Sequence, residues 1–198
     1  MFNRENFENY INVFLEQNSK LNLISKNDEK FLWEKHIFDS LAIEKFFEKY
    51  TIGKNLLDIG TGGGFPSVPV SLAYPQIEVY GLDSIRKKIN AIENIKQELN
   101  IKNLHTICDR AENVKQKFDI ITSRAVATLD KITSYAMPLL NKDGYFVAYK
   151  SVRAQEEISA AQKILKKYRA EIIDVIEYDL PLEENHTRNL IVIKHSGK

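Results

Sequence analysis

The chain has 198 residues, of which 43% are hydrophobic, with 28 basic and 27 acidic side chains that give a net charge of +1. At roughly 100–200 residues per domain, this is the length of one domain. The single cysteine excludes a disulfide framework and a cysteine-based zinc site. The longest uncharged stretch, 59–77, holds 4 glycines and 3 prolines and excludes a membrane-spanning helix. We expect a cytoplasmic globular protein without a signal peptide. The small net charge argues against a partner held by bulk charge, although local basic patches remain possible.

The first fifty residues are predicted to be helical, because apolar side chains such as Tyr10, Ile11 and Phe14 recur at helical spacing. This segment contains 7 basic and 9 acidic residues, a net charge of −2. We therefore predict that residues 1–50 form an N-terminal helical extension packed on a domain that comprises residues 51–198.

From residue 55 onward, short apolar runs alternate with helical patterns. The predicted strands cover 55–59, 77–82, 104–108, 118–122, 145–149, 172–178 and 190–195. Helices are predicted to start at Pro66 and to cover 84–100, 129–140 and 156–168, with a turn at 141–144. Apolar runs without alternation are typical of a parallel sheet that is covered on both faces, and the short connection before the last run indicates antiparallel pairing. The fold class is α/β: a doubly wound, mostly parallel, seven-stranded Rossmann-like sheet with an antiparallel C-terminal strand.

A glycine-rich loop follows the first predicted strand and opens a helix. Gly60, Gly62 and their neighbours lack Cβ atoms, so a ligand can approach the backbone closely. In this fold class the binding crevice lies at the carboxyl ends of the strands. The dinucleotide fingerprint fails, because Phe65 or Ser67 stands where its third glycine is required. The loop therefore favours a nucleoside without phosphates, such as S-adenosylmethionine, over NAD; a flexible surface turn is the alternative.

Three later positions flank the same predicted crevice. Asp83 ends the second strand and can accept hydrogen bonds from ribose hydroxyls, or it can cap the following helix. Ala111 and Glu112 follow the third strand and can contact an adenine edge, or they simply form a turn and a helix start. Arg124 ends the fourth strand and is expected to face cofactor and target; the alternative is an ion pair with Asp58 or Glu112.

Several segments together resemble a known family, and they lie in the family's order over nearly the whole chain. They are 22–25, 36–40, 57–66, 82–84, 123–125 and 190–194. This combination is similar to the bacterial 16S ribosomal RNA guanine-N7 methyltransferase family, once called glucose-inhibited division protein B. Two departures stand out: Ser67 replaces a glycine that is usual in the family, and Tyr149-Lys150-Ser151 replaces its usual Leu-Lys-Gly.

The resemblance implies an S-adenosylmethionine-dependent methyltransferase domain in residues 51–198, with S-adenosylhomocysteine as product. It implies that the target is a guanine in the decoding region of 16S ribosomal RNA. The partner is then this RNA or the small ribosomal subunit, with no DNA and no membrane, and we expect a monomer. Together with the glycine loop, the implied cofactor-binding residues are Gly60, Gly62, Phe65, Asp83, Ala111, Glu112 and Arg124.

The chemistry of such a reaction agrees with the residues present. Guanine N7 carries a free lone pair and needs alignment more than a general base. We therefore predict no catalytic base and no metal. Cys108 ends an apolar strand and is expected to be an inert buried thiol, not a nucleophile. His36 is either an RNA or lid contact or a packed structural residue.

Two basic segments are candidates for holding RNA, which requires local positive charge. Residues 84–117 contain 8 basic and 4 acidic side chains, and residues 150–170 contain 6 and 2. Each can equally be a solvated helix face. Both segments begin just after a strand, so their first basic residues are expected near the crevice: Arg86, Lys87, Lys150 and Arg153. The alternatives to an RNA methyltransferase are a small-molecule methyltransferase with the same cofactor and a non-enzymatic RNA-binding or ribosome-binding module.

Overall fold

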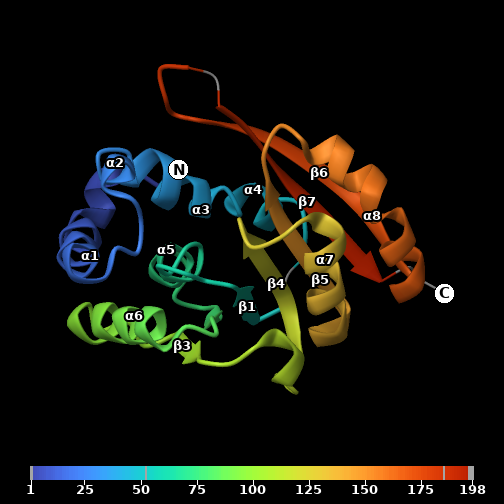
Figure 1. Cartoon of the computed structure of the whole chain (residues 1–198), viewed down its shortest axis with the longest axis horizontal. Helices are drawn as coiled ribbons and strands as arrows, with labels where there is room; N and C mark the ends of the chain where they lie inside the picture. Colours follow the sequence, from blue (N-terminus) through green and yellow to red (C-terminus); the bar gives the residue numbers. More distant parts are fainter. Residues whose placement is uncertain (1, 52, 185, 196–198) are drawn as a thin grey trace.

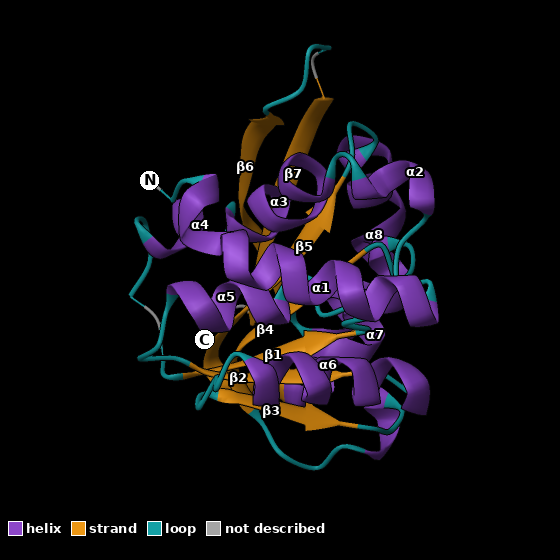
Figure 2. Ribbon diagram, turned by 90° about the vertical axis from the view of Figure 1, so that its left-hand side faces the viewer, coloured by secondary structure: helices purple, strands orange, loops and turns teal. Residues whose placement is uncertain are grey.

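The computed structural model describes residues 2–51, 53–184 and 186–195. In this part of the chain a seven-stranded sheet has helices on both faces (Figures 1 and 2). The strand order is β3-β2-β1-β4-β5-β7-β6. The strands are β1 (Asn55–Ile59), β2 (Glu78–Leu82), β3 (Leu104–Ile107), β4 (Phe118–Arg124), β5 (Leu140–Lys150), β6 (Ala170–Leu180) and β7 (His186–His195). The pairs from β3 to β5 are parallel, whereas β7 runs antiparallel to β5 and to β6. The predicted fold class is confirmed.

The helices that connect the strands agree with the sequence pattern except in one crossover. They are α5 (Ser67–Ala73), α6 (Arg86–Glu98), α7 (Leu129–Ala136) with η4 (Met137–Leu139), and α8 (Ala154–Tyr168). Between β3 and β4 the structure has only the one-turn helix η3 (Ala111–Asn113). The prediction of regular strand–helix alternation is wrong at this point, since the short segment before β4 has no apolar stripe that could cover the sheet.

The predicted turn at 141–144 is also wrong, because these residues belong to the long strand β5. The pairing between β4 and β5 shifts there: Leu140 lies opposite Phe118, and Tyr145 lies opposite Ile120. A Cβ atom at Gly144 would approach the backbone oxygen of Asp119 to 2.6 Å. The glycine therefore marks a close approach of two strands at a bulge, not a change of chain direction.

The N-terminal helices lie on one face of the sheet, together with α5 and α6, and α7 and α8 lie on the other (Figure 2). They are η1 (Arg4–Phe7), α1 (Glu8–Leu21), α2 (Lys26–Glu29), the π-helix η2 (Trp33–Phe38), α3 (Asp39–Leu41) and α4 (Glu44–Phe47). Side chains alternate across the sheet: Leu56 packs in the core shared with Phe14 and Phe46, whereas Leu57 packs in the core below α7. The helices of residues 4–47 thus share a core with the sheet, and the domain boundary at residue 50 stays a prediction. Among the described residues, every helix is too short or too polar to cross a membrane.

Candidate functional site

The glycine loop connects β1 to α5, which begins directly after Pro66. Gly60 and Gly62 have φ angles of +73° and +58°, in the left-handed region that favours glycine. The backbone N–H groups of Gly60 and Thr61 donate to the carbonyl oxygen of Leu82 at 2.8 and 2.9 Å. A Cβ atom at Gly60 would overlap the side chain of Val126. The loop is therefore fixed against the end of β2, and its first position accepts only glycine without rearrangement.

A cavity of about 490 Å³ opens beside this loop, at the carboxyl ends of β1, β2 and β4. We call it the cofactor cavity, after the residues in its wall that were predicted to bind a cofactor. Four of the residues predicted to bind the cofactor line it: Gly60, Asp83, Ala111 and Glu112. The other three do not: Gly62, Phe65 and Arg124. Residues that were not predicted complete its wall, among them Lys88, Arg110, Val126 and Tyr135.

Asp83 lines the cavity but does not cap α6, whose N-cap is Ile85 without a side-chain cap hydrogen bond. One carboxylate oxygen accepts the N–H of Ile85 at 2.9 Å, just before α6, and the other accepts the N–H of Gly62 at 3.1 Å. Lys88 lies 3.8 Å from the second oxygen. Each carboxylate oxygen has two lone pairs, so both can accept another hydrogen bond. The predicted cap of the helix is therefore wrong, and binding of the ribose hydroxyls by Asp83 stays a prediction.

Asp58 lies below the glycine loop and is fully buried. Its Oδ1 accepts a hydrogen bond from the Thr122 hydroxyl at 3.1 Å, whereas Oδ2 has no partner among the described residues. Burial raises the pKa of Asp58 to about 6, although neighbouring hydroxyls and the Arg124 charge act in the opposite direction. Asp58 is not among the site residues that were predicted from the sequence. The sequence feature that could have identified it is a carboxylate within an apolar strand, two positions before the first glycine of the loop.

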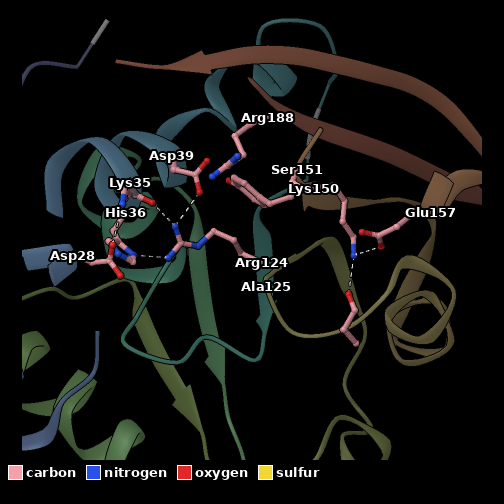
Figure 3. A pocket seen from close by; sticks show the side chains of 12 residues that line it. Asp28, Lys35, His36, Asp39, Arg124, Ala125, Lys150, Ser151, Glu157 and Arg188 are labelled. Carbon is pink, nitrogen blue, oxygen red and sulfur yellow. Dashed lines mark hydrogen bonds and ion pairs between the residues drawn. The ribbon is translucent and has the colours of Figure 1, made fainter. Parts of the chain in front are cut away.

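A second cavity, of about 440 Å³, adjoins the first, since Ala125 lines both (Figure 3). We call it the arginine cavity. Its walls come from the N-terminal helices, the ends of β4 and β5, α8 and β7. Ala125 has a φ of +55°, an unfavourable value for a residue with a Cβ atom. Such backbone strain is found preferentially at functional sites.

Arg124 extends from β4 into the arginine cavity and is held by the N-terminal helices (Figure 3). Its Nη1 donates to Asp39 Oδ2 and to the Lys35 carbonyl oxygen, both at 2.9 Å. The second oxygen of Asp39 accepts the Tyr178 hydroxyl hydrogen bond at 2.7 Å. The predicted alternative, an ion pair with Asp58 or Glu112, is wrong. The sequence pattern did not show that residues near 39 cover the end of β4.

His36 is packed inside this network. Its Nδ1 lies 3.0 Å from Arg124 Nη2, and its ring packs against Phe65 with 5.0 Å between centroids. Burial, followed by the charge of Arg124, lowers the pKa of His36 to about 4. Because a guanidinium only donates, Nδ1 accepts and the proton of the neutral ring lies on Nε2. That Nε2 is buried without a partner among the described residues.

We predict that Asp58 and His36 affect stability in opposite directions between pH 4 and 7. The folded-state pKa of Asp58 is raised, so its contribution is present below about pH 4 and is lost as the pH rises through 6. The folded-state pKa of His36 is lowered, so its contribution is present above about pH 6.5 and is lost as the pH falls through 4. Asp58→Asn should therefore steepen the rise of the unfolding free energy with pH, and His36→Asn should flatten it. Between pH 4 and 7, each substitution should alter the pH-dependent change in the free energy of unfolding by about 3 kcal/mol.

Urea unfolding at pH 4, 5, 6 and 7 measures these slopes. Asp143→Asn is a matched control, because Asp143 is an exposed carboxylate on β5. The assignment of either buried group fails if its variant shows the same pH dependence as the control.

Of the four basic residues predicted near the crevice from the two basic segments, one lines a cavity and three do not. Lys150 lines the arginine cavity, but its ammonium donates to Glu157 at 2.6 Å and to the Ala127 carbonyl oxygen at 2.7 Å. Arg86, Lys87 and Arg153 are exposed and line neither cavity. Cys108 is half-buried, not buried as expected, and packs against the core.

Arg188 on β7 lines the arginine cavity and was missed by the sequence analysis. It lies outside both basic segments, six positions before Lys194, the next lysine or arginine. Its place opposite Arg124 follows only from the pairing of β7 with β5 and β6.

Comparison with known proteins shows the family to which the chain belongs. The sequence model of the family described as rRNA small subunit methyltransferase G (GidB) matches residues 3–191. The chain belongs to this family. As the sequence analysis predicted, the protein is therefore an rRNA small subunit methyltransferase. The chain is 39% identical to the ribosomal RNA small subunit methyltransferase G of Desulfitobacterium hafniense, over 98% of this chain and 82% of that protein. The Bacillus subtilis protein of the same name is 35% identical, over 96% and 81%.

Solved structures show the fold of this rRNA methyltransferase in more distant proteins. A S-adenosylmethionine-dependent methyltransferase from Clostridium acetobutylicum matches with a TM-score of 0.62 at 16% identity, over 94% of this chain and 99% of that chain. A ribosomal protein L11 methylase from Lactobacillus delbrueckii matches with a TM-score of 0.59 at 16% identity, over 80% and 78%. The sheet described above is thus the fold of S-adenosylmethionine-dependent methyltransferases.

Proposed function

We propose that the protein transfers the methyl group of S-adenosylmethionine to N7 of a guanine in 16S ribosomal RNA. The observation that carries this proposal is the pair of adjoining cavities at the carboxyl ends of the parallel strands, which share Ala125. One cavity has the residues for the cofactor and the other has the size and charge for a nucleotide. Methyl transfer needs two ligands side by side, since the sulfonium carbon and the attacking atom must meet in line.

The cofactor cavity fits S-adenosylmethionine in size and in residue type. Its volume of about 490 Å³ lies within the range of small-molecule sites. Gly60 leaves the backbone open, and Asp83 offers carboxylate lone pairs to the two ribose hydroxyls. Ala111 and Glu112 supply a backbone amide and a carboxylate for the adenine edge. The bound cofactor supplies an electrophilic methyl group on a sulfonium.

The residues of the arginine cavity position the target without taking a proton from it. Guanine N7 attacks with its lone pair, so no base has to act first. His36 stays neutral at physiological pH because burial and Arg124 lower its pKa to about 4. Arg124 is held by Asp39, so its guanidinium is a fixed part of the wall of the arginine cavity. The role of these residues is therefore to orient the target.

The remaining expectations belong to the same proposal. The substrate is the 16S RNA or the small ribosomal subunit in the cytoplasm, and the enzyme acts as a monomer. Family membership favours this reaction over a small-molecule methyltransferase and over a non-enzymatic RNA-binding module. Binding of RNA should weaken steeply with salt, whereas binding of a small neutral substrate should not.

The direct test is mass spectrometry of 16S ribosomal RNA from cells with and without the gene. We expect one N7-methylguanine to be present in wild-type RNA, absent after deletion and restored by the wild-type gene but not by a Gly60→Asp variant. An unchanged N7-methylguanine content after deletion would contradict the proposed reaction. Calorimetry with S-adenosylmethionine then distinguishes the enzyme, which binds this cofactor, from a non-enzymatic RNA-binding module, which does not.

A further inference from the structure

The arginine cavity has one cation more than its carboxylates can balance. Four basic side chains and three carboxylates line it. Three ion pairs account for six of these groups: Lys35 with Asp28 at 3.0 Å, Arg124 with Asp39 at 2.9 Å, and Lys150 with Glu157 at 2.6 Å. The fourth cation is Arg188. Among the described residues it has no ion-pair partner, and its side chain donates one hydrogen bond, to the carbonyl oxygen of the adjacent Thr187 at 3.3 Å.

The backbone holds Arg188 rigidly at this place. Residue 188 lies opposite Tyr178 of β6, and the next residue, Asn189, pairs with Lys150 of β5. The Asn189 side chain also donates to the carbonyl oxygen of Ser151 at 3.2 Å. Figure 3 shows the Arg188 side chain extending from its strand into the cavity, above Arg124. The stem is half-buried, so a charged head group is presented in one direction with part of its conformational freedom already lost.

An unpaired guanidinium in a cavity favours binding of a negatively charged ligand. It remains charged at every physiological pH, and its planar donor fork matches two oxygens of a phosphate. In water-poor surroundings an unmatched charge is costly, so a ligand that supplies the missing negative charge gains affinity. The strand of RNA that brings a guanine into this cavity carries such phosphates on both sides of the nucleotide.

We propose that Arg188 binds a backbone phosphate of the RNA strand that carries the target guanine. The inference rests on the proposed function and adds a residue to it. A contact with the base itself is less suitable. An arginine that recognises guanine donates hydrogen bonds to O6 and N7 at the same time, whereas N7 must stay free to receive the methyl group. The other three cations of the cavity have carboxylate partners, so Arg188 is the one whose charge the ligand must balance.

The test compares Arg188→Gln with Arg188→Lys and with Lys142→Gln. Lys142 is exposed at the amino-terminal end of β5, the opposite end of the strand from Lys150. It therefore controls for the loss of one positive charge away from the cavities. Binding of small ribosomal subunits is measured over a series of salt concentrations, together with KM and kcat for methylation and calorimetric affinity for S-adenosylmethionine.

We expect Arg188→Gln to raise KM for the RNA substrate by about tenfold, in line with the loss of a charged hydrogen bond, and to change kcat much less. The slope of log affinity against log salt should become shallower by about 0.7–0.9, the value for one phosphate contact. Arg188→Lys should keep the wild-type slope, and cofactor affinity should not change in any of the three variants.

The proposal is overturned if Arg188→Gln has the same salt dependence of binding and the same KM as Lys142→Gln. It is also overturned if Arg188→Lys reduces the salt dependence as much as Arg188→Gln does. Failure of the proposed function is a different result: wild-type protein would then neither bind S-adenosylmethionine nor methylate the subunit.

Discussion

Gly60→Asp should abolish binding of S-adenosylmethionine, with a loss of affinity of more than about a hundredfold, or about 2.8 kcal/mol. Two features of the position explain the size of this effect. The φ of +73° places the residue in the left-handed region, and a Cβ atom would overlap Val126 on the cavity wall. The new carboxylate would also extend into the cofactor cavity that Gly60 lines. Isothermal titration calorimetry with the cofactor measures the loss.

Gly62→Ala is the matched control for this variant. Gly62 also has a positive φ, of +58°, but a Cβ atom there would meet nothing closer than the Gly60 carbonyl oxygen at 3.8 Å. It therefore has the backbone strain of about 1–2 kcal/mol without the steric overlap. We expect this control to lower thermal stability and to reduce cofactor affinity far less than Gly60→Asp does. Wild-type affinity in a folded Gly60→Asp protein would contradict the placement of the cofactor beside this loop.

Asp39→Ala should lower the free energy of unfolding by about 3–5 kcal/mol, because it leaves a buried cation without its counter-ion. The Asp39 and Arg124 side chains are only 7% and 15% exposed. The substitution also removes the acceptor of the Tyr178 hydroxyl, so a second buried polar group loses its partner. Because these contacts join the N-terminal helices to β4 and β6, the variant should loosen the helices that cover the arginine cavity.

Denaturant unfolding of three proteins tests this prediction. Glu16→Ala breaks an ion pair with Lys20 whose side chains are 57% and 58% exposed, and it should cost no more than about 1 kcal/mol. Asp39→Leu combined with Arg124→Met removes both charges and should recover part of the stability lost in Asp39→Ala. An effect of Asp39→Ala equal to that of Glu16→Ala would show that the pair does not hold the two parts together.

Local patterns in the sequence were enough to place the sheet and one side of the site. Apolar runs predicted each strand, and in β1 and β4 they do not alternate, because a strand buried on both faces needs apolar side chains at successive positions. The glycine loop and Asp83 could be assigned to the cofactor crevice, since both follow strands whose carboxyl ends meet at one edge. The exceptions in the fold were η3 and the bulged start of β5, where the pattern was too short or contained a glycine with a packing role.

The other side of the site was decided by tertiary structure. Arg124 and Asp39 are 85 positions apart, and only the packing of the N-terminal helices over the end of β4 brings them together. The same packing keeps the half-buried His36 neutral. Pairing of Lys150 with Glu157 removes a predicted RNA contact from the free cations, and the antiparallel return of β7 places Arg188 in the cavity instead.

The sequence by itself therefore determined the family, the strand order along the chain and the backbone features that open the cofactor cavity, because these depend on periodicity and on residues close together in the chain. Only the tertiary structure decided which charges are balanced. Ion pairs depend on distances between side chains from remote segments. A sum over the sequence, here +1, does not show that Arg188 is the cation of the arginine cavity without an ion-pair partner among the described residues.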